Sequence, residues 1–85
     1  MAKVIVALKI MPKDVNVDLD TLENTIKSEI NPEKIEREPI AFGLTALKVT
    51  KFVEDAGGQV ELLENKLKNI EGIGNVEVVE LTRSL

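Results

Sequence analysis

The side chains that could do chemistry in this chain are mostly carboxylates, because 15 of its 85 residues are Asp or Glu. The tightest group is Asp14, Asp18 and Asp20. A calcium-binding EF-hand loop also needs a glycine and a terminal glutamate at fixed spacing, and this group lacks both. Carboxylates that open an amphipathic segment cap a helix and favour its N-terminus. Helix capping is therefore the favoured interpretation, and no metal site is expected.

Missing residue types exclude whole classes of catalysis. The chain has no cysteine and no histidine, so it can form no disulfide, no thiolate or imidazole metal site and no histidine general base. Glu36 and Glu38 occupy alternate positions of an expected edge strand and therefore share a solvated face. Charges in such a place discourage edge-to-edge aggregation. No nucleophile stands beside a base. We therefore expect no active site and no cofactor.

Two glycine-containing stretches resemble anion sites only superficially. Gly57 and Gly58 precede a helical pattern whose N-terminus could bind an anion, but a simple turn is the favoured interpretation. The stretch from Glu71 to Gly74 follows a helical pattern instead of opening one, so it cannot act as a phosphate loop. Neither stretch predicts a nucleotide site.

The stretch EPIAFGLTAL contains Phe42, one of only two aromatic residues in the chain, next to Gly43. One interpretation is that Phe42 folds back onto the sheet and Gly43 forms a bulge. The other is that Phe42 stands at a hairpin tip as an exposed anchor for a partner. The residue pattern alone leaves both open.

The first half of the chain predicts a strand, a helix and a second strand. The segment from Lys3 to Met11 carries apolar residues on both faces of an extended strand, which indicates a strand in the centre of a sheet. The segment VDLDTLENTIKSEI has an apolar helical stripe with Asp18 as N-cap. It ends at Asn31-Pro32, because the residue before proline avoids helical dihedrals. Lys34 to Phe42 contains Pro39, which cannot donate to a ladder and therefore indicates an edge strand.

The second half predicts a strand, a helix and a last strand. Leu44 to Glu54 is extended, although its mixed pattern does not settle which face is buried. After the loop from Asp55 to Gly58, the segment QVELLENKLKNI has a helical stripe, with Gly72 as its C-terminal cap. Asn75 to Thr82 changes apolar phase midway, which a bulge or burial on both faces would explain.

The predicted order is β-α-β-β-α-β. Packing two helices on one face of a four-stranded antiparallel sheet, with right-handed crossovers, gives a ferredoxin-like α+β sandwich. No segment is left over for a second domain, so residues 1–85 are predicted to form one domain.

Charge and aromatic content argue against nucleic acid and membrane partners. The net charge is −4, which opposes attraction to phosphate backbones. RNA-binding sheets of this topology stack bases on aromatic residues of the two central strands, and these strands offer only Phe52. The apolar run in MAKVIVALKI is too short to span a bilayer and alternates like a strand, so no anchor or signal peptide is expected. These features predict a cytoplasmic protein.

The whole chain resembles the archaeal translation elongation factor 1-beta family. The similarity runs through the VIVALKIMP start, the VDLDTLENTIK helix, the EPIAFGLTALKV core and the IEGIGNVEVVELTR ending, and its most specific block is Glu38 to Val49. This resemblance implies a ferredoxin-like fold and guanine-nucleotide exchange on elongation factor 1-alpha, the GTPase that delivers aminoacyl-tRNA to the ribosome.

The resemblance also implies where the partner is contacted. Phe42 and Gly43 match a Phe-Gly turn that, in the family, inserts against the nucleotide domain of the GTPase. A basic residue near the family's C-terminus reaches the Mg²⁺ site, and Arg83 is the basic candidate here, although its register differs from the eukaryotic lysine. Flanking contacts are expected from three apolar neighbours of the turn: Ile40, Ala41 and Leu44.

An alternative from another class also fits the residue pattern. A ferredoxin-like module could use its sheet face for self-association, as a structural protein without exchange activity. The oligomeric mass and the release of fluorescent GDP from the GTPase distinguish the two hypotheses.

Overall fold

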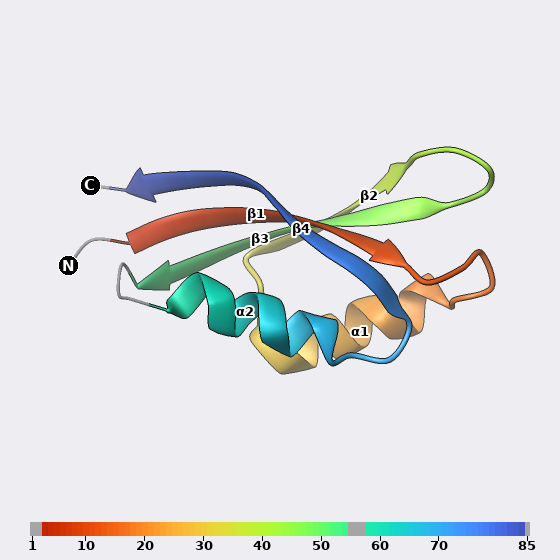
Figure 1. Cartoon of the computed structure of the whole chain (residues 1–85), viewed down its shortest axis with the longest axis horizontal. Coiled ribbons are helices and arrows are strands. Elements are labelled where there is room, and N and C mark those ends of the chain that lie inside the picture. The colour runs from red at the N-terminus through yellow and green to blue at the C-terminus, as the bar shows by residue number, and fades with distance from the viewer. Residues whose placement is uncertain (1–2, 55–57, 85) are drawn as a thin grey trace.

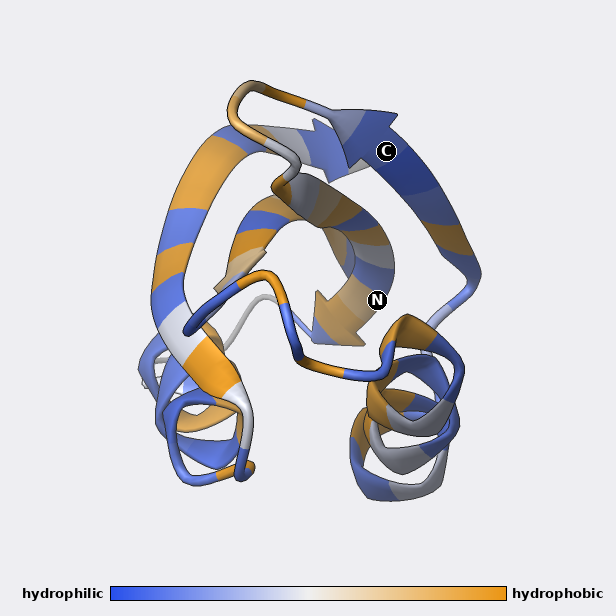
Figure 2. Ribbon diagram, turned by 90° about the vertical axis from the view of Figure 1, so that its right-hand side faces the viewer, coloured by the Kyte–Doolittle hydropathy of each residue, from blue (hydrophilic) through white to orange (hydrophobic). Residues whose placement is uncertain are grey.

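The computed structural model describes residues 3–54 and 58–84, and within them the chain forms a sheet covered by helices on one face (Figures 1 and 2). The sheet is antiparallel, and its strands lie in the order β2 (Lys34–Pro39), β3 (Thr45–Glu54), β1 (Lys3–Pro12) and β4 (Ile73–Ser84). This arrangement confirms the ferredoxin-like α+β fold. Residues 55–57 of the predicted loop lie outside the described residues. In chain order the described elements are β1 (Lys3–Pro12), α1 (Leu19–Ile30), β2 (Lys34–Pro39), β3 (Thr45–Glu54), α2 (Gln59–Lys68) and β4 (Ile73–Ser84).

Strand β1 is the centre of the sheet, because it pairs with β3 on one side and β4 on the other. Its alternate residues Val4, Val6, Leu8 and Ile10 are all buried. They belong to one apolar cluster with residues from both helices, and burial of such side chains contributes about 1.5 to 3 kcal/mol each. The cluster also contains Leu22, Ile26, Ile30, Leu47, Val49, Leu63, Leu67, Ile70 and Val76.

Helix α1 begins and ends where the sequence predicts. The Asp18 carboxylate accepts hydrogen bonds from the N–H groups of Asp20 and Thr21, at 3.0 and 3.3 Å. At the other end Asn31 adopts a left-handed conformation, and its N–H donates to the carbonyl of Lys27. Both ends of the helix therefore satisfy backbone groups that would otherwise lack partners.

The buried face of β3, which the sequence leaves open, is the one that carries Leu47 and Val49. Lys51 lies on this same face, and its exposed fraction is intermediate. Its Nζ donates to the backbone oxygen of Asn31 at 3.0 Å. The lysine on an apolar face thus binds a carbonyl at the C-terminal end of α1, where positive charge is favourable.

Helix α2 is shorter than predicted, since it ends at Lys68 with Asn69 as its C-terminal cap. The predicted capping role of Gly72 is therefore wrong. The chain leaves the helix through short turns, in which Ile70 N–H donates to Leu67 and Ile73 N–H donates to Ile70. Gly72 has a φ of +97° in this connection, and its carbonyl accepts the N–H of Lys13 at 2.9 Å.

Strand β4 carries the bulge that its change of apolar phase predicts. Leu8 pairs with Val78 and Ala7 pairs with Glu80, so Val79 has no partner on β1. The Val79 side chain is 47 % exposed, which excludes burial on both faces at this point. The bulge therefore accounts for the phase change.

Replacement of the Asp18 cap tests this account of α1. We expect Asp18→Ala to lower the stability by about 1 kcal/mol, because two helical N–H groups lose their acceptor. The unfolding temperature of a domain of this size should fall by roughly 4 to 8 °C. Asp18→Asn keeps a side-chain oxygen and serves as the control. Equal unfolding temperatures for Asp18→Ala and the wild type in a calorimetric scan would contradict the assignment.

Candidate functional site

The connection between β2 and β3 forms a hairpin tip that is closed by backbone hydrogen bonds. Pro39 pairs with Thr45 at its base. Beyond this pair, Ile40 N–H donates to Leu44, and Leu44 N–H donates to Ala41, both at 2.9 Å. Two residues on one side of the hairpin therefore face one residue on the other, as in a β-bulge. These bonds fix the path of the chain on both sides of Phe42 and Gly43.

Phe42 and Gly43 are the central residues of the turn, and both have left-handed backbone conformations. Their φ angles are +54° and +80°. Positive φ at both central positions is characteristic of a type I′ hairpin turn. Glycine adopts this conformation freely, whereas a residue with a Cβ pays about 1 kcal/mol or more. Phe42 is therefore held in a strained conformation.

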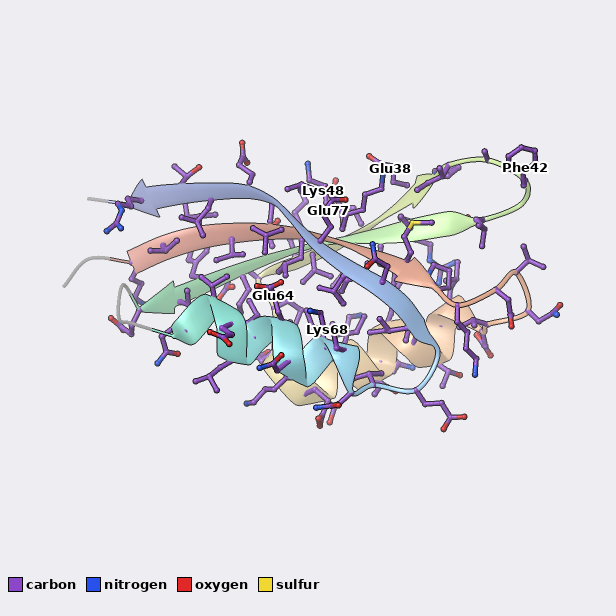
Figure 3. All side chains as sticks on the ribbon, viewed as in Figure 1. Glu38, Phe42, Lys48, Glu64, Lys68 and Glu77 are labelled. Atoms are coloured by element: carbon purple, nitrogen blue, oxygen red, sulfur yellow. The ribbon has the colours of Figure 1, made fainter. Side chains whose placement is uncertain are left out.

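The Phe42 side chain projects into solvent from this turn. It is 97 % exposed, and Figure 3 shows it pointing away from the tip of the hairpin, clear of the sheet. The interpretation in which Phe42 packs back onto the sheet is therefore wrong. An aromatic ring with almost all of its surface in water contributes nothing to the core of this domain.

The neighbours of Phe42 extend its apolar surface unevenly. Ile40 is 43 % exposed and Ala41 is exposed, whereas Leu44 is partly buried. The three residues expected to share contacts with Phe42 therefore do lie around it, but Leu44 offers the least free surface.

Val15, an apolar residue that no sequence pattern singles out, lies beside the hairpin tip. It belongs to the loop between β1 and α1 and is 58 % exposed. A Cβ built on Gly43 would lie 3.8 Å from Val15 Cγ1, so the two loops are neighbours. The available signal was a valine between Asp14 and Asn16, in a polar loop where no strand or helix period requires an apolar residue.

Arg83 does not lie near Phe42. It pairs with Val4 on β1, and Val4 pairs with Val53 on β3. Val53 is nine residues along the chain from Leu44 at the hairpin tip, and at the rise of a β-strand this corresponds to about 30 Å. Figure 1 accordingly shows the end of β4 and the hairpin tip at opposite ends of the longest axis. The predicted contact residues thus form two separate surfaces.

Several of the described carboxylates lie on the surface in hydrogen bonds and ion pairs. In the part of the chain that the structure describes, no three of them could hold a metal ion together. Glu23 accepts from Arg37 Nε at 2.6 Å, and Asp20 accepts from the other end of the same guanidinium. The hydrogen bond to Glu23, and to a smaller extent the one to Asp20, raises the pKa of Arg37. Glu36 and Glu38 form surface ion pairs with Lys34 and Lys9, as expected for side chains on a solvated edge strand.

Two other features singled out in the sequence, Gly58 and Phe52, lie away from the hairpin tip. Gly58 is the N-cap of α2, without a side-chain hydrogen bond, and Gly57 lies outside the described residues. Phe52, the second aromatic residue of the chain, is 42 % exposed on β3. None of the helices in residues 3–54 and 58–84 is both long and apolar enough to cross a bilayer.

Comparison with known proteins relates this geometry to a family. Residues 5–83 match the family model of the EF-1 guanine nucleotide exchange domain. The chain is 47 % identical over 89 residues to elongation factor 1-beta of Aeropyrum pernix, and 45 % identical over 89 residues to that of Staphylothermus marinus; both alignments cover 98 % of each chain. It is 42 % identical over 83 residues to elongation factor 1-beta of Methanosphaerula palustris, which covers 96 % of this chain and 98 % of the relative.

The match includes the strained hairpin turn and extends through β4 as far as Arg83. Identity of this level over nearly the full length of each relative is far above what a shared fold alone requires. The chain therefore belongs to the EF-1 guanine nucleotide exchange domain family.

Proposed function

We propose that this chain accelerates the release of GDP from elongation factor 1-alpha, and that residues 1–85 act as one exchange domain. The observation that supports this best is the Phe42 ring, which is 97 % exposed on a hydrogen-bonded, strained turn. A ring in this position is suited to insertion into a partner protein. The proposal requires no cofactor, nucleic acid or membrane, and the site of action is the cytoplasm, where translation takes place.

Exchange on a GTPase is a matter of linked binding equilibria. The GTPase holds GDP through its phosphate loop and Mg²⁺. A factor that binds the GTPase more tightly when this site is distorted or empty weakens nucleotide binding, and the nucleotide weakens the binding of the factor by the same ratio. The chain therefore needs a docking surface and no catalytic group of its own.

The required free energy indicates that Phe42 does not act alone. Accelerating release about a thousandfold takes roughly 4 kcal/mol of differential stabilisation. Full burial of one phenylalanine contributes about 1.5 to 3 kcal/mol. Contacts from Ile40, Ala41 and Leu44 are therefore part of the proposed docking surface.

Backbone strain at Phe42 supports the same assignment. Left-handed conformations of residues other than glycine tend to occur at functional sites, where the surrounding structure holds them in place. Here the ladder of β2 and β3 supplies that support. Neither the conformation nor the exposure of Phe42 stabilises the folded domain, so an interaction outside the domain best explains both.

Arg83 is proposed as a second contact with the GTPase. It lies about 30 Å from the hairpin tip along the sheet, so a GTPase that contacts both must offer two surfaces at this separation. Phe42 and Arg83 would then act on different parts of the partner. In this proposal Arg83 acts at the Mg²⁺ site of the GTPase.

Truncation of Phe42 tests the proposed function. We expect Phe42→Ala to remain folded, because the ring makes no core contact, and to slow the factor-stimulated release of fluorescent GDP at least tenfold. Phe52→Ala is the matched control, since it removes the other phenylalanine, which lies on β3. Release that is as fast with Phe42→Ala as with the wild type would show that the ring is not the anchor, and a wild type without stimulation would favour the self-associating module.

Relief of the backbone strain gives a second, independent test. We expect Phe42→Asn to be more stable than the wild type by up to about 1 kcal/mol, because asparagine tolerates the left-handed conformation and no burial is lost. Its stimulated release should still be slowed at least tenfold. The measurement pairs an unfolding scan with the GDP-release assay. A lower unfolding temperature for Phe42→Asn would contradict the strain assigned to this turn.

A further inference from the structure

An apolar residue outside the family's Phe-Gly turn shares the end of the molecule with Phe42. Val15 is 58 % exposed and lies beside Gly43, and Ile40 and Phe42 of the same hairpin are 43 % and 97 % exposed. Figure 2 looks at this end of the molecule, where the hairpin loop and the loop between β1 and α1 come toward the viewer. Two segments that are far apart in sequence thus bring exposed apolar residues to one end of the molecule.

The loop that carries Val15 is held in place by specific contacts. The Asp14 carboxylate accepts the N–H of Asn16 at 2.8 Å, which fixes a local turn. Lys13 N–H donates to the carbonyl of Gly72 at 2.9 Å. Gly74 packs so closely that an added Cβ would lie 2.8 Å from Lys13 Cα. The exposure of Val15 is therefore a fixed feature of the fold.

The space between the two loops indicates the kind of partner. A hollow of about 40 Å³ separates them, lined among others by Asp14, Val15, Gly43 and Leu44. Pockets that bind small ligands usually measure about 300 to 1,000 Å³. The hollow is too small for such a ligand, whereas exposed apolar side chains on two neighbouring loops suit the surface of a protein.

We propose that Val15 is a second apolar anchor for the GTPase, beside Gly43 and at the same end of the molecule as Phe42; this inference rests on the proposed function. The occupant is an apolar patch on the GTPase wide enough to cover both loops. Val15 adds affinity by burying its side chain, and because its loop is already ordered, little entropy is lost on docking.

Val15→Thr tests this inference, because threonine keeps the shape of valine and replaces one methyl group by a hydroxyl. We expect the concentration of factor that gives half-maximal GDP release from elongation factor 1-alpha to rise about fivefold. Val15→Asp, which adds a charge at the same place, should raise it at least tenfold. Val79→Thr is the matched control, since Val79 is a similarly exposed valine on β4, and it should stay within twofold of the wild type.

The outcomes separate this inference from the proposed function. If the wild type accelerates release and both Val15 variants stay within twofold of Val79→Thr, the inference is overturned and the proposed function stands. A wild type that does not accelerate release overturns both. Unfolding scans of the Val15 variants within a few degrees of the wild type, together with the expected shifts, support a direct contact.

Discussion

The antiparallel pairing of β1 with both β3 and β4 is the constraint on which the rest of the structure depends. Because β1 lies between two strands, its alternate apolar residues form the floor on which both helices pack. The same pairing holds β3 along nearly its whole length, from Leu47 to Glu54. The hairpin that β3 forms with β2 therefore projects from an anchored base, which makes its tip a rigid extension of the core.

A rigid tip changes what docking costs. Ordering a flexible loop on binding consumes part of the interaction free energy, whereas the turn at Phe42 and Gly43 is already closed by its own hydrogen bonds. The strain at Phe42 is sustained by the ladder behind it, as expected where local strain is tolerated by well-determined surroundings. The sheet thus holds the proposed contact surface in one conformation before docking.

Most of the fold could be predicted from the sequence, because independent signals agree on the same elements. These signals are the spacing of the apolar residues, the N-cap at Asp18 and the positions of the prolines. The end of α2 could not be predicted, because a glycine such as Gly72 usually marks the end of a helix. Here its positive φ belongs instead to a later turn, and the Gly72 carbonyl accepts the N–H of Lys13. The exposure of Phe42 depended on whether the hairpin folds back, which local patterns do not determine. Val15 was missed for a similar reason. It stands out only because it lies beside a loop about 30 residues away in the chain, and the tertiary structure alone brings the two together.

The separation of Phe42 and Arg83 along the sheet has a consequence for how such a protein can diverge. Residues more than about 7 to 10 Å apart without shared partners usually affect free energy additively. Changes at the end of β4 can then accumulate without disturbing the turn at the opposite end. A change in the tail therefore leaves the Phe-Gly turn folded, so the two ends of the molecule are independent in their effect on the stability of the domain.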